Sequence, residues 1–136
     1  MTPNEIVHKM FDNDPFSKWL GIVLENIGAG QCTLSMTIRK EMLNGFGIAH
    51  GAITYAIADS ALAFASNSHG RQSLSIDTSI NHIESLKEGD RIVAIAKENA
   101  MKNKFGFYSV KVIKEDVVVA LFKGTVYRSD RKWEIN

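Results

Sequence analysis

Asp59 is the one carboxylate within NGFGIAHGAITYAIAD, residues 44–59, a segment that is otherwise largely apolar. Burying a carboxylate without a partner costs several kcal/mol, so its presence needs a reason. A catalytic acid, base or nucleophile whose surroundings tune its reactivity is one reason. An aspartate at a subunit interface, hydrogen-bonded to a neighbouring backbone or hydroxyl group, is another. The residue and its surroundings leave both interpretations open.

Gly51 stands where the apolar segment is expected to start a helix. The first N–H groups of a helix lack an intrahelical acceptor and carry partial positive charge. They can therefore stabilise a carbonyl oxygen that becomes negative during acyl transfer. Glycine also lets a substrate approach the backbone closely. The simpler alternative is a helix start that needs a flexible residue.

Gly51 and Asp59 can serve one reaction only if two chains supply them. They are separated by eight positions, or roughly 12 Å along a helix. Groups that act on one reacting carbon must lie within a few Å of it. The pair therefore predicts a two-fold dimer with two equivalent sites. Each site takes Gly51 from one chain and Asp59 from an antiparallel helix of the other.

Two helices are expected around these residues. Residues 50–68 are rich in Ala, Leu and Ile and apolar on nearly every face, which predicts a helix buried on all sides that ends at residues 69–70. A shorter helix is predicted from Pro3 to about Asp12, with Thr2 as its N-cap. Residues 40–49 are expected to form a glycine-bearing loop before the long helix.

Alternating apolar and polar residues predict six strands. Two of them form a hairpin around residues 28–30. The other four are expected at residues 72–83, 90–101, 105–115 and 117–128, in a meander. A sheet that must bury one long helix curls around it. The predicted fold class is α+β, with an antiparallel sheet wrapped around one long central helix.

Size and composition predict one globular domain over residues 1–136, with 45% hydrophobic and 23% charged residues. The formal net charge of +1 gives no reason to expect nucleic acid or a membrane surface as a partner. The N-terminus does not resemble a secretory signal, and the most apolar stretch, residues 52–65, is too short to cross a bilayer. We expect a cytoplasmic protein.

Neither a metal nor a cofactor is expected. Cys32 lies in the alternating pattern CTLSMTI, which predicts a buried strand residue rather than a nucleophile, and a single cysteine fits a reducing compartment. Gly45 and Gly47 lack the lysine and the βαβ context of a phosphate-binding loop. The histidines show no ligand spacing. They are His8, His50, His69 and His82.

The segment MLNGFGIAHGAITYAIADSALAFASNS resembles the N-x-x-G-x-x-H-G-G pattern, followed by Ala-Asp, of the PaaI-type branch of hotdog-fold thioesterases. The matching residues are Asn44, Gly47, His50, Gly51 and Asp59. The similarity continues through SLSIDTSINHIESLKEGD and covers nearly the whole chain. Ala52 stands in place of the second glycine, and DTSINHIES lacks a proline that relatives often carry after the aromatic residue.

The resemblance implies a hotdog fold and hydrolysis of an acyl-coenzyme A thioester to a free acid and coenzyme A. The Gly51 N–H would polarise the thioester carbonyl. Asp59 of the partner chain would attack it as nucleophile or activate water as base. Asn44 would lie near the carbonyl or the attacking water, donating or accepting through its amide. His50, the fourth catalytic candidate, would order the loop and helix start rather than exchange protons.

Substrate-binding candidates follow from the same resemblance and from charge. Ser75 resembles the position of a hydroxyl near the active site, and Asp77 is expected beside it on the same strand face. Basic residues in a turn and at the last strand are candidates for the coenzyme A phosphates, although surface turns often carry lysine for solubility. The full set is Gly47, Ser75, Asp77, His82, Lys102, Lys104 and Arg128. Ring side chains that either line an acyl pocket or belong to the core are Phe46, Tyr55, Phe64, His82, Phe105 and Phe107.

Two other functions suit the same fold. Hotdog hydratases and dehydratases use a different histidine and carboxylate arrangement, and the fatty-acid dehydratases have a Pro-Gly-rich stretch that this chain lacks. A noncatalytic acyl-CoA sensor would be expected to lack the helix acid and often to carry a DNA-binding domain. The expected partners are therefore acyl-CoA, with an aryl-acetyl or medium-chain acyl group, and further copies of the chain in a dimer or a tetramer of two dimers.

Overall fold

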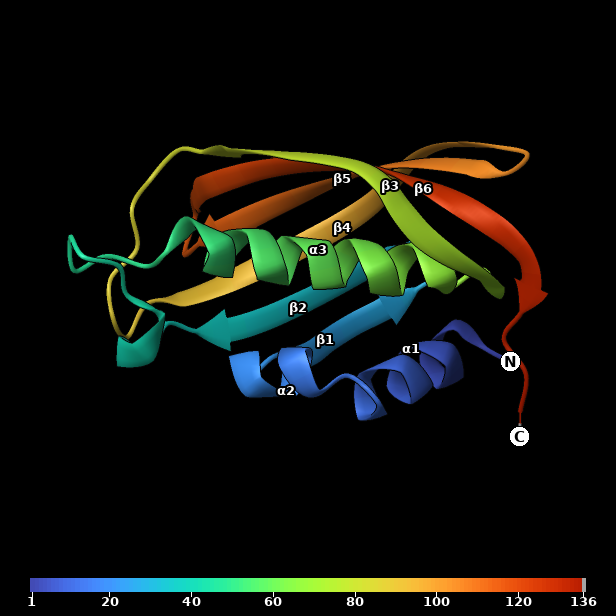
Figure 1. The fold of residues 1–136 in the computed structure, drawn as a ribbon, viewed down its shortest axis with the longest axis horizontal. Coiled ribbons are helices and arrows are strands. Elements are labelled where there is room, and N and C mark those ends of the chain that lie inside the picture. The colour runs from blue at the N-terminus through green and yellow to red at the C-terminus, as the bar shows by residue number, and fades with distance from the viewer. Residues whose placement is uncertain (136) are drawn as a thin grey trace.

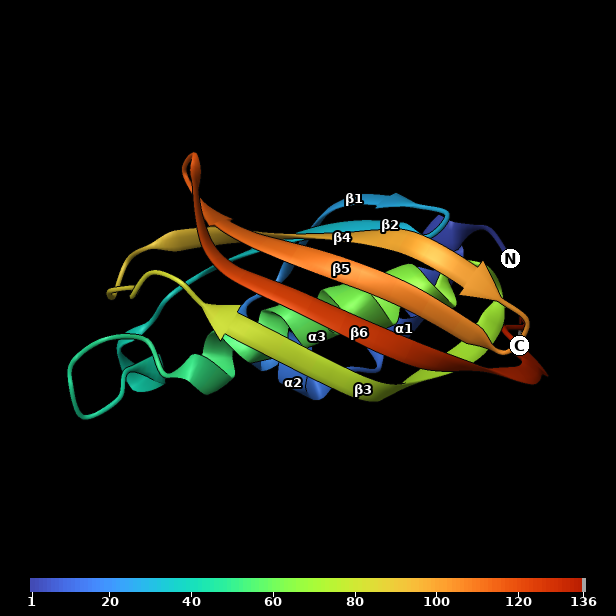
Figure 2. The same cartoon turned by 90° about the horizontal axis from the view of Figure 1, so that it is seen from above.

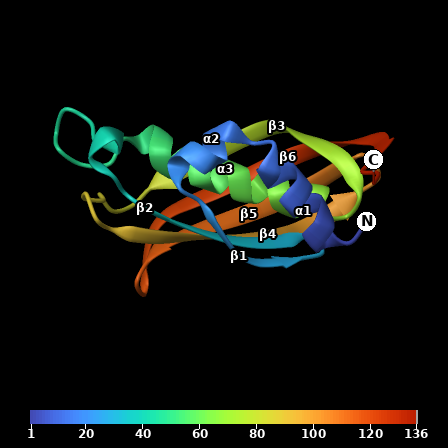
Figure 3. The same ribbon diagram turned by 90° about the horizontal axis from the view of Figure 1, so that it is seen from below.

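The apolar helix α3 (Gly51–Asn67) lies along the concave face of one antiparallel sheet in the computed structural model, which describes residues 1–135 (Figure 1). The strands are β1 (Val23–Gly28), β2 (Gln31–Thr37), β3 (Arg71–His82), β4 (Arg91–Lys102), β5 (Phe105–Lys114) and β6 (Val117–Lys132). Helices α1 (Pro3–Asp12) and α2 (Pro15–Leu20) lie on the side of α3 away from the sheet (Figure 3), and a 3-10 turn, η1 (Lys40–Met42), precedes the loop before α3. The predicted sheet around one central helix is confirmed.

The apolar residues of α3 are buried because they face both the sheet and the short helices. Ile57, Ala58 and Ala61 have no exposed surface. They pack with the inward residues of the central strands, such as Ala94 of β4, in one continuous core. Cys32 of β2 belongs to this core, and burial raises the pKa of its thiol to about 12. It is therefore the buried strand residue that the sequence predicts.

The sheet order is β1-β2-β4-β5-β6-β3, which corrects the predicted four-strand meander. Strands β4, β5 and β6 form a meander, but β3 pairs with β6 at one edge, and β4 pairs with β2 instead (Figure 2). Burial explains this order. Ile92 and Ala94 of β4 are fully buried, which suits a central strand, whereas Leu74 of β3 is 76% exposed, which suits an edge.

A bulge in β3 corrects a second expectation. Ser75 pairs with Val126 of β6, and Asp77 pairs with the adjacent Thr125, because Ile76 is an extra residue in β3. Neighbouring residues of a strand face opposite sides of a sheet, and paired residues share a side. Ser75 and Asp77 therefore face opposite sides of the sheet.

The N-terminal helices have clear start signals. Thr2 caps α1 as predicted, with a reciprocal pair of hydrogen bonds to Glu5. Helix α2 was not predicted because six residues are too few to show a periodic pattern. Asp14 caps it by accepting a hydrogen bond from the Ser17 N–H at 3.0 Å, and Pro15 occupies its first turn.

The C-terminal end of α3 is closed by the side chain of the buried Asn67. Its Nδ2 donates to the carbonyl oxygens of Ala63 and Ser73, at 2.8 and 3.0 Å. Its Oδ1 accepts from the Ser73 N–H at 2.8 Å and from the Trp133 Nε1–H at 2.9 Å. One amide therefore joins the end of α3 to the start of β3 and to the segment after β6.

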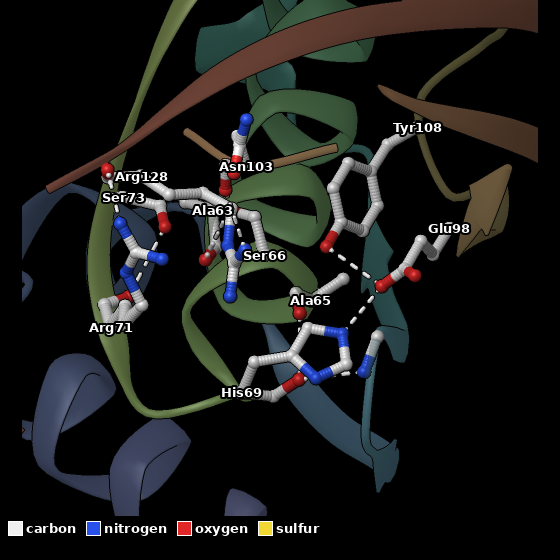
Figure 4. A network of polar contacts seen from close by, with 12 residues as sticks. Ala63, Ala65, Ser66, His69, Arg71, Ser73, Glu98, Asn103, Tyr108 and Arg128 are labelled. Carbon is white, nitrogen blue, oxygen red and sulfur yellow. Dashed lines mark hydrogen bonds and ion pairs between the residues drawn. The ribbon is translucent and has the colours of Figure 1, made fainter. Parts of the chain in front are cut away.

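A second group of polar contacts, which includes His69, lies at the same end of α3 (Figure 4). His69 pairs with Glu98 of β4, which also accepts a hydrogen bond from the Tyr108 hydroxyl of β5 at 3.2 Å. Burial and the negative charge of Glu98 raise the pKa of Tyr108. Arg71 of β3 donates to the carbonyl oxygen of Arg128 in β6 at 2.9 Å. These contacts join β4 and β5 to the residues that follow α3, and join β3 to β6.

Candidate active site

The N-terminal end of α3 leaves one backbone donor free. His50 is the N-cap residue, and its Nδ1 accepts a hydrogen bond from the Ala52 N–H at 3.1 Å. The His50 carbonyl oxygen accepts from the Ile53 N–H at 2.9 Å. No acceptor within residues 1–135 takes a hydrogen bond from the Gly51 N–H. His50 therefore orders the helix start, and Gly51 offers the free donor.

The loop before α3 is held by Asn44. Its Oδ1 accepts hydrogen bonds from the N–H groups of Phe46 and Ile48, at 2.9 and 3.4 Å. Gly47 at the loop tip has φ of +79°, a conformation that favours glycine. Because its oxygen is occupied by the loop, Asn44 can offer a ligand only the donors of its NH2 group. It lines a recess of about 270 Å³ with Gly51 and His82.

Asp59 lies two turns further along α3, in a half-buried position. Within residues 1–135 its carboxylate has neither a hydrogen bond nor an ion pair, and burial raises its pKa. It lines an open groove of about 480 Å³ along one face of the helix, together with Gly51, Tyr55 and His82. A raised pKa brings a carboxylate closer to the range in which it accepts a proton at neutral pH.

Gly51 and Asp59 thus lie on the same face of α3 but are too far apart to contact the same substrate atom. The groove between them passes Ala52, Tyr55 and Ala56, so the two groups stand at its two ends. Their separation is about 12 Å along the helix, which is too far for both to touch one reacting carbon. In one copy of the chain the constellation is therefore incomplete.

His82, at the end of β3, joins the groove to the recess. It lines both hollows, and its ring lies against Gly51. Tyr55 is held over the groove by a hydrogen bond between its hydroxyl and that of Thr78 in β3. The structure thus brings four sequence candidates, Asn44, Gly51, Asp59 and His82, to one face of the molecule.

Other candidates lie elsewhere in the same copy. Asp77 faces the outer side of the sheet, in a recess with Lys123 and Thr125, away from α3. The turn between β4 and β5, with Lys102 and Lys104, lies at the opposite end of α3 from the loop before Gly51 (Figures 1 and 2). Ser75 borders none of the hollows that hold Gly51 or Asp59.

Arg128 has a structural task in one copy of the chain. Its Nη1 donates to the carbonyl oxygen of Asn103 at 2.9 Å, and its backbone N–H donates to the carbonyl oxygen of Lys104 at 2.7 Å. Both bonds fix the turn between β4 and β5. They place Arg128 at the end of α3 opposite Gly51 of the same copy, and its assignment to substrate binding stays a prediction.

The phenylalanine and tyrosine candidates lie in different parts of the structure, and Tyr55 is the one beside the Asp59 groove. Tyr55 lines the Asp59 groove, whereas Phe64 belongs to the buried core. Phe46 is 91% exposed at the loop tip. Phe105 and Phe107 alternate with the buried Tyr108 and face the outer side of the sheet, so they do not line the groove beside α3.

Phe16 of α2 is the groove residue that sequence reasoning missed. It borders Asp59 and stacks on Trp19 with ring centroids 6.0 Å apart. A hydrogen bond of 2.9 Å between the hydroxyls of Ser17 and Ser60 holds α2 beside this part of α3. The Asp-Pro pair at residues 14–15, a helix start signal, was the clue available in the sequence.

The sequence of the chain is similar to those of known thioesterases and esterases. The profile of the thioesterase superfamily matches residues 46–121. A putative esterase of Archaeoglobus fulgidus is 38% identical over 120 residues, which cover 88% of this chain and 78% of that protein. The acyl-coenzyme A thioesterase PaaI of Escherichia coli is 31% identical over 122 residues, which cover 89% of this chain and 87% of that protein.

Solved structures agree with the sequence comparisons. The structure of the E. coli PaaI protein from the phenylacetic acid degradation operon superposes with a TM-score of 0.93 at 29% identity, over 96% of this chain and 95% of that one. Among residues 1–135 no helix is long and apolar enough to cross a bilayer.

Proposed function

The chain belongs to the thioesterase superfamily and hydrolyses acyl-coenzyme A thioesters, and we propose that two copies of the chain form each catalytic centre together. The observation that carries the proposal is the pair of unpartnered groups on one face of α3. The Gly51 N–H lacks an acceptor and the Asp59 carboxylate lacks a donor within the described part of one copy. A second, antiparallel α3 brings each group opposite the other.

The free edge of β3 supports this dimer. β3 has 12 residues, and β6 occupies only one of its sides. Leu74 and Ile76 on this strand are 76% and 58% exposed. Long edge strands with exposed apolar residues pair readily with another chain. Two β3 strands paired about a two-fold axis would join the sheets and lay the two α3 helices side by side in opposite directions.

The chemistry then divides between the two copies. The Gly51 N–H of one copy polarises the thioester carbonyl and holds its oxygen when the carbon becomes tetrahedral. Asp59 of the other copy takes a proton from water while the water oxygen adds to the carbon. The C–S bond then breaks to release the free acid, and the proton passes from Asp59 to the leaving sulfur, which restores the carboxylate and releases coenzyme A. Direct attack by Asp59, followed by hydrolysis of the anhydride, gives the same products.

Four more side chains receive roles in this dimer. Phe16 and Tyr55 give the Asp59 groove an apolar wall for the acyl group. Antiparallel helices would carry the β4–β5 turn of one copy, with Lys102 and Lys104, toward the loop of the other copy, where coenzyme A phosphates would need positive charge. A tetramer of two dimers and a cytoplasmic location stay predictions.

Complementation between two inactive variants tests the shared centre. Gly51→Pro removes the N–H at the first helical position, where proline is tolerated, and His50 before it has an extended ψ of 136° that suits a following proline. Asp59→Asn removes the charge with little change in shape. Each homodimer should be nearly inactive. Mixed dimers, purified through two different tags, should recover about half of wild-type turnover, because one of two sites is intact.

Gly51→Ala is the matched control, because it adds a side-chain carbon and keeps the N–H. Its turnover should exceed that of Gly51→Pro. Circular dichroism and size-exclusion chromatography establish that each variant is folded and dimeric. Folded mixed dimers without recovered activity would refute the shared centre, and so would full activity of the Asp59→Asn homodimer.

A further inference from the structure

His82 lies unusually close to the backbone of Gly51. A side-chain carbon added to Gly51 would stand 3.2 Å from His82 Nε2, 3.4 Å from Cε1 and 3.9 Å from Cδ2. The Cα–Cβ direction in a helix tilts toward the N-terminus. The imidazole therefore lies on the N-terminal side of Gly51, toward which the free N–H also points, and Nε2 is its nearest atom.

This contact limits the distance between two nitrogen atoms. Standard bond lengths place a Cβ about 2.5 Å from the backbone nitrogen of its own residue. The Gly51 nitrogen and His82 Nε2 are therefore at most about 5.7 Å apart, the sum of this length and the 3.2 Å contact. One oxygen atom can lie about 2.9 Å from both nitrogens and accept a hydrogen bond from each.

The His82 ring is available for such a bond. Within residues 1–135 neither of its nitrogens has a hydrogen-bond partner, and its side chain is exposed. His50, the neighbouring histidine, differs because its Nδ1 is occupied by the Ala52 N–H. His82 also borders both the groove of Asp59 and the recess of Asn44, so a thioester bound between them passes its ring.

We propose that His82 is a catalytic residue whose Nε2–H donates a second hydrogen bond to the thioester oxygen, beside the Gly51 N–H. The inference rests on the proposed function. When the carbonyl carbon becomes tetrahedral, its oxygen gains negative charge, and two donors stabilise that charge more than one. His82 keeps its proton throughout the step, and the proton from water goes to Asp59.

A pair of substitutions separates hydrogen bonding from packing. His82→Phe keeps an aromatic ring against Gly51 but has no donor, whereas His82→Gln keeps a donor and loses the ring. We expect His82→Phe to lower kcat by about 10²-fold or more with little change in KM. His82→Gln should recover at least part of this loss. A packing role predicts the reverse order, with the Phe variant active and the Gln variant impaired.

Further variants keep the test decisive. If His82→Phe does not fold, His82→Leu and His82→Gln form a second pair of similar size, and the Leu variant should be the slower one. Wild type and Asp59→Asn are assayed alongside. An inactive wild type or a fully active Asp59→Asn would contradict the proposed function itself. Full activity of a folded His82→Phe or His82→Leu, with those two controls as expected, would overturn only the role of His82.

Discussion

The two ends of α3 differ in whether their polar groups have hydrogen-bond partners. At the C-terminal end, Asn67 makes four hydrogen bonds, and His69, Glu98 and Tyr108 satisfy one another. At the N-terminal end, the Gly51 N–H has no partner within residues 1–135, and further along the same helix neither has the Asp59 carboxylate. Both groups are only half-buried and line the same open groove, so a ligand or a second chain can still reach them.

The residues at the two ends are also expected to contribute to different properties, Asn67 to stability and Asp59 to activity. The hydrogen bonds of Asn67 hold β3 and the end of the chain against the helix, and none of them involves the groove. Asp59 stabilises nothing within one copy, because burial acts on it without a compensating partner. Substitutions at the two ends should therefore have effects of different kinds.

Replacing Asp59 should produce the largest effect and the clearest break between the two ends. Asp59→Asn is expected to lower kcat/KM by about 10³-fold or more, because the base or nucleophile is lost. The folded protein should nevertheless become more stable. The folded state holds the Asp59 proton to a higher pH than the unfolded state, so stability falls as pH rises through that interval, and an amide avoids the loss.

Steady-state hydrolysis and thermal denaturation at neutral pH measure both effects. Asp116→Asn, in an exposed turn, is the matched control and should leave kcat/KM and Tm unchanged. An Asp59→Asn variant that keeps its activity, or that melts at a lower temperature than wild type, would contradict the contrast drawn between the two ends.

Replacing Asn67 should have the converse effect. Asn67→Ala leaves the N–H and C=O of Ser73 without their partner in a buried position. The expected loss in the free energy of unfolding is about 2–4 kcal/mol, while kcat per folded molecule stays near the wild-type value. Urea denaturation and active-site-normalised kinetics test this. Asn26→Ala on the exposed side of β1 serves as control, and a fall in kcat without a fall in stability would remove the distinction.

The pH profile gives the smallest and most specific effect. Because burial raises the pKa of Asp59 above 3.8, the ordinary value for aspartate, kcat/KM should fall with decreasing pH in an acid limb centred above that value. Activity is highest where Asp59 is ionised. The His82→Phe variant should keep the same limb at a lower rate, since the limb belongs to the carboxylate. A limb at or below the ordinary value would mean that Asp59 is not desolvated in the working enzyme.

Patterns within one segment of sequence predicted helix α3 and its candidate residues. Features that depend on contacts between distant segments could not be predicted. The apolar surroundings of Asp59 and the position of Gly51 are visible within one segment, so the sequence alone was enough to select both as candidates, and their catalytic roles stay predictions. The bulge at Ile76, which turns Asp77 away, depends on pairing with β6 and leaves no local signal. The contact of His82 with Gly51 joins residues from two elements and required the fold. Helix α2, with Phe16, was too short for its period to be recognised.

The open edge of β3 relates turnover per molecule to the concentration of the protein. If each catalytic centre needs two chains, a dilute solution contains monomers. Each monomer holds one part of two centres and no complete centre. Mass action then makes the working fraction fall as the protein becomes scarce, so turnover per molecule declines on dilution. Pairing through the open edge of β3 would then couple the rate of thioester cleavage per molecule to the concentration of the protein.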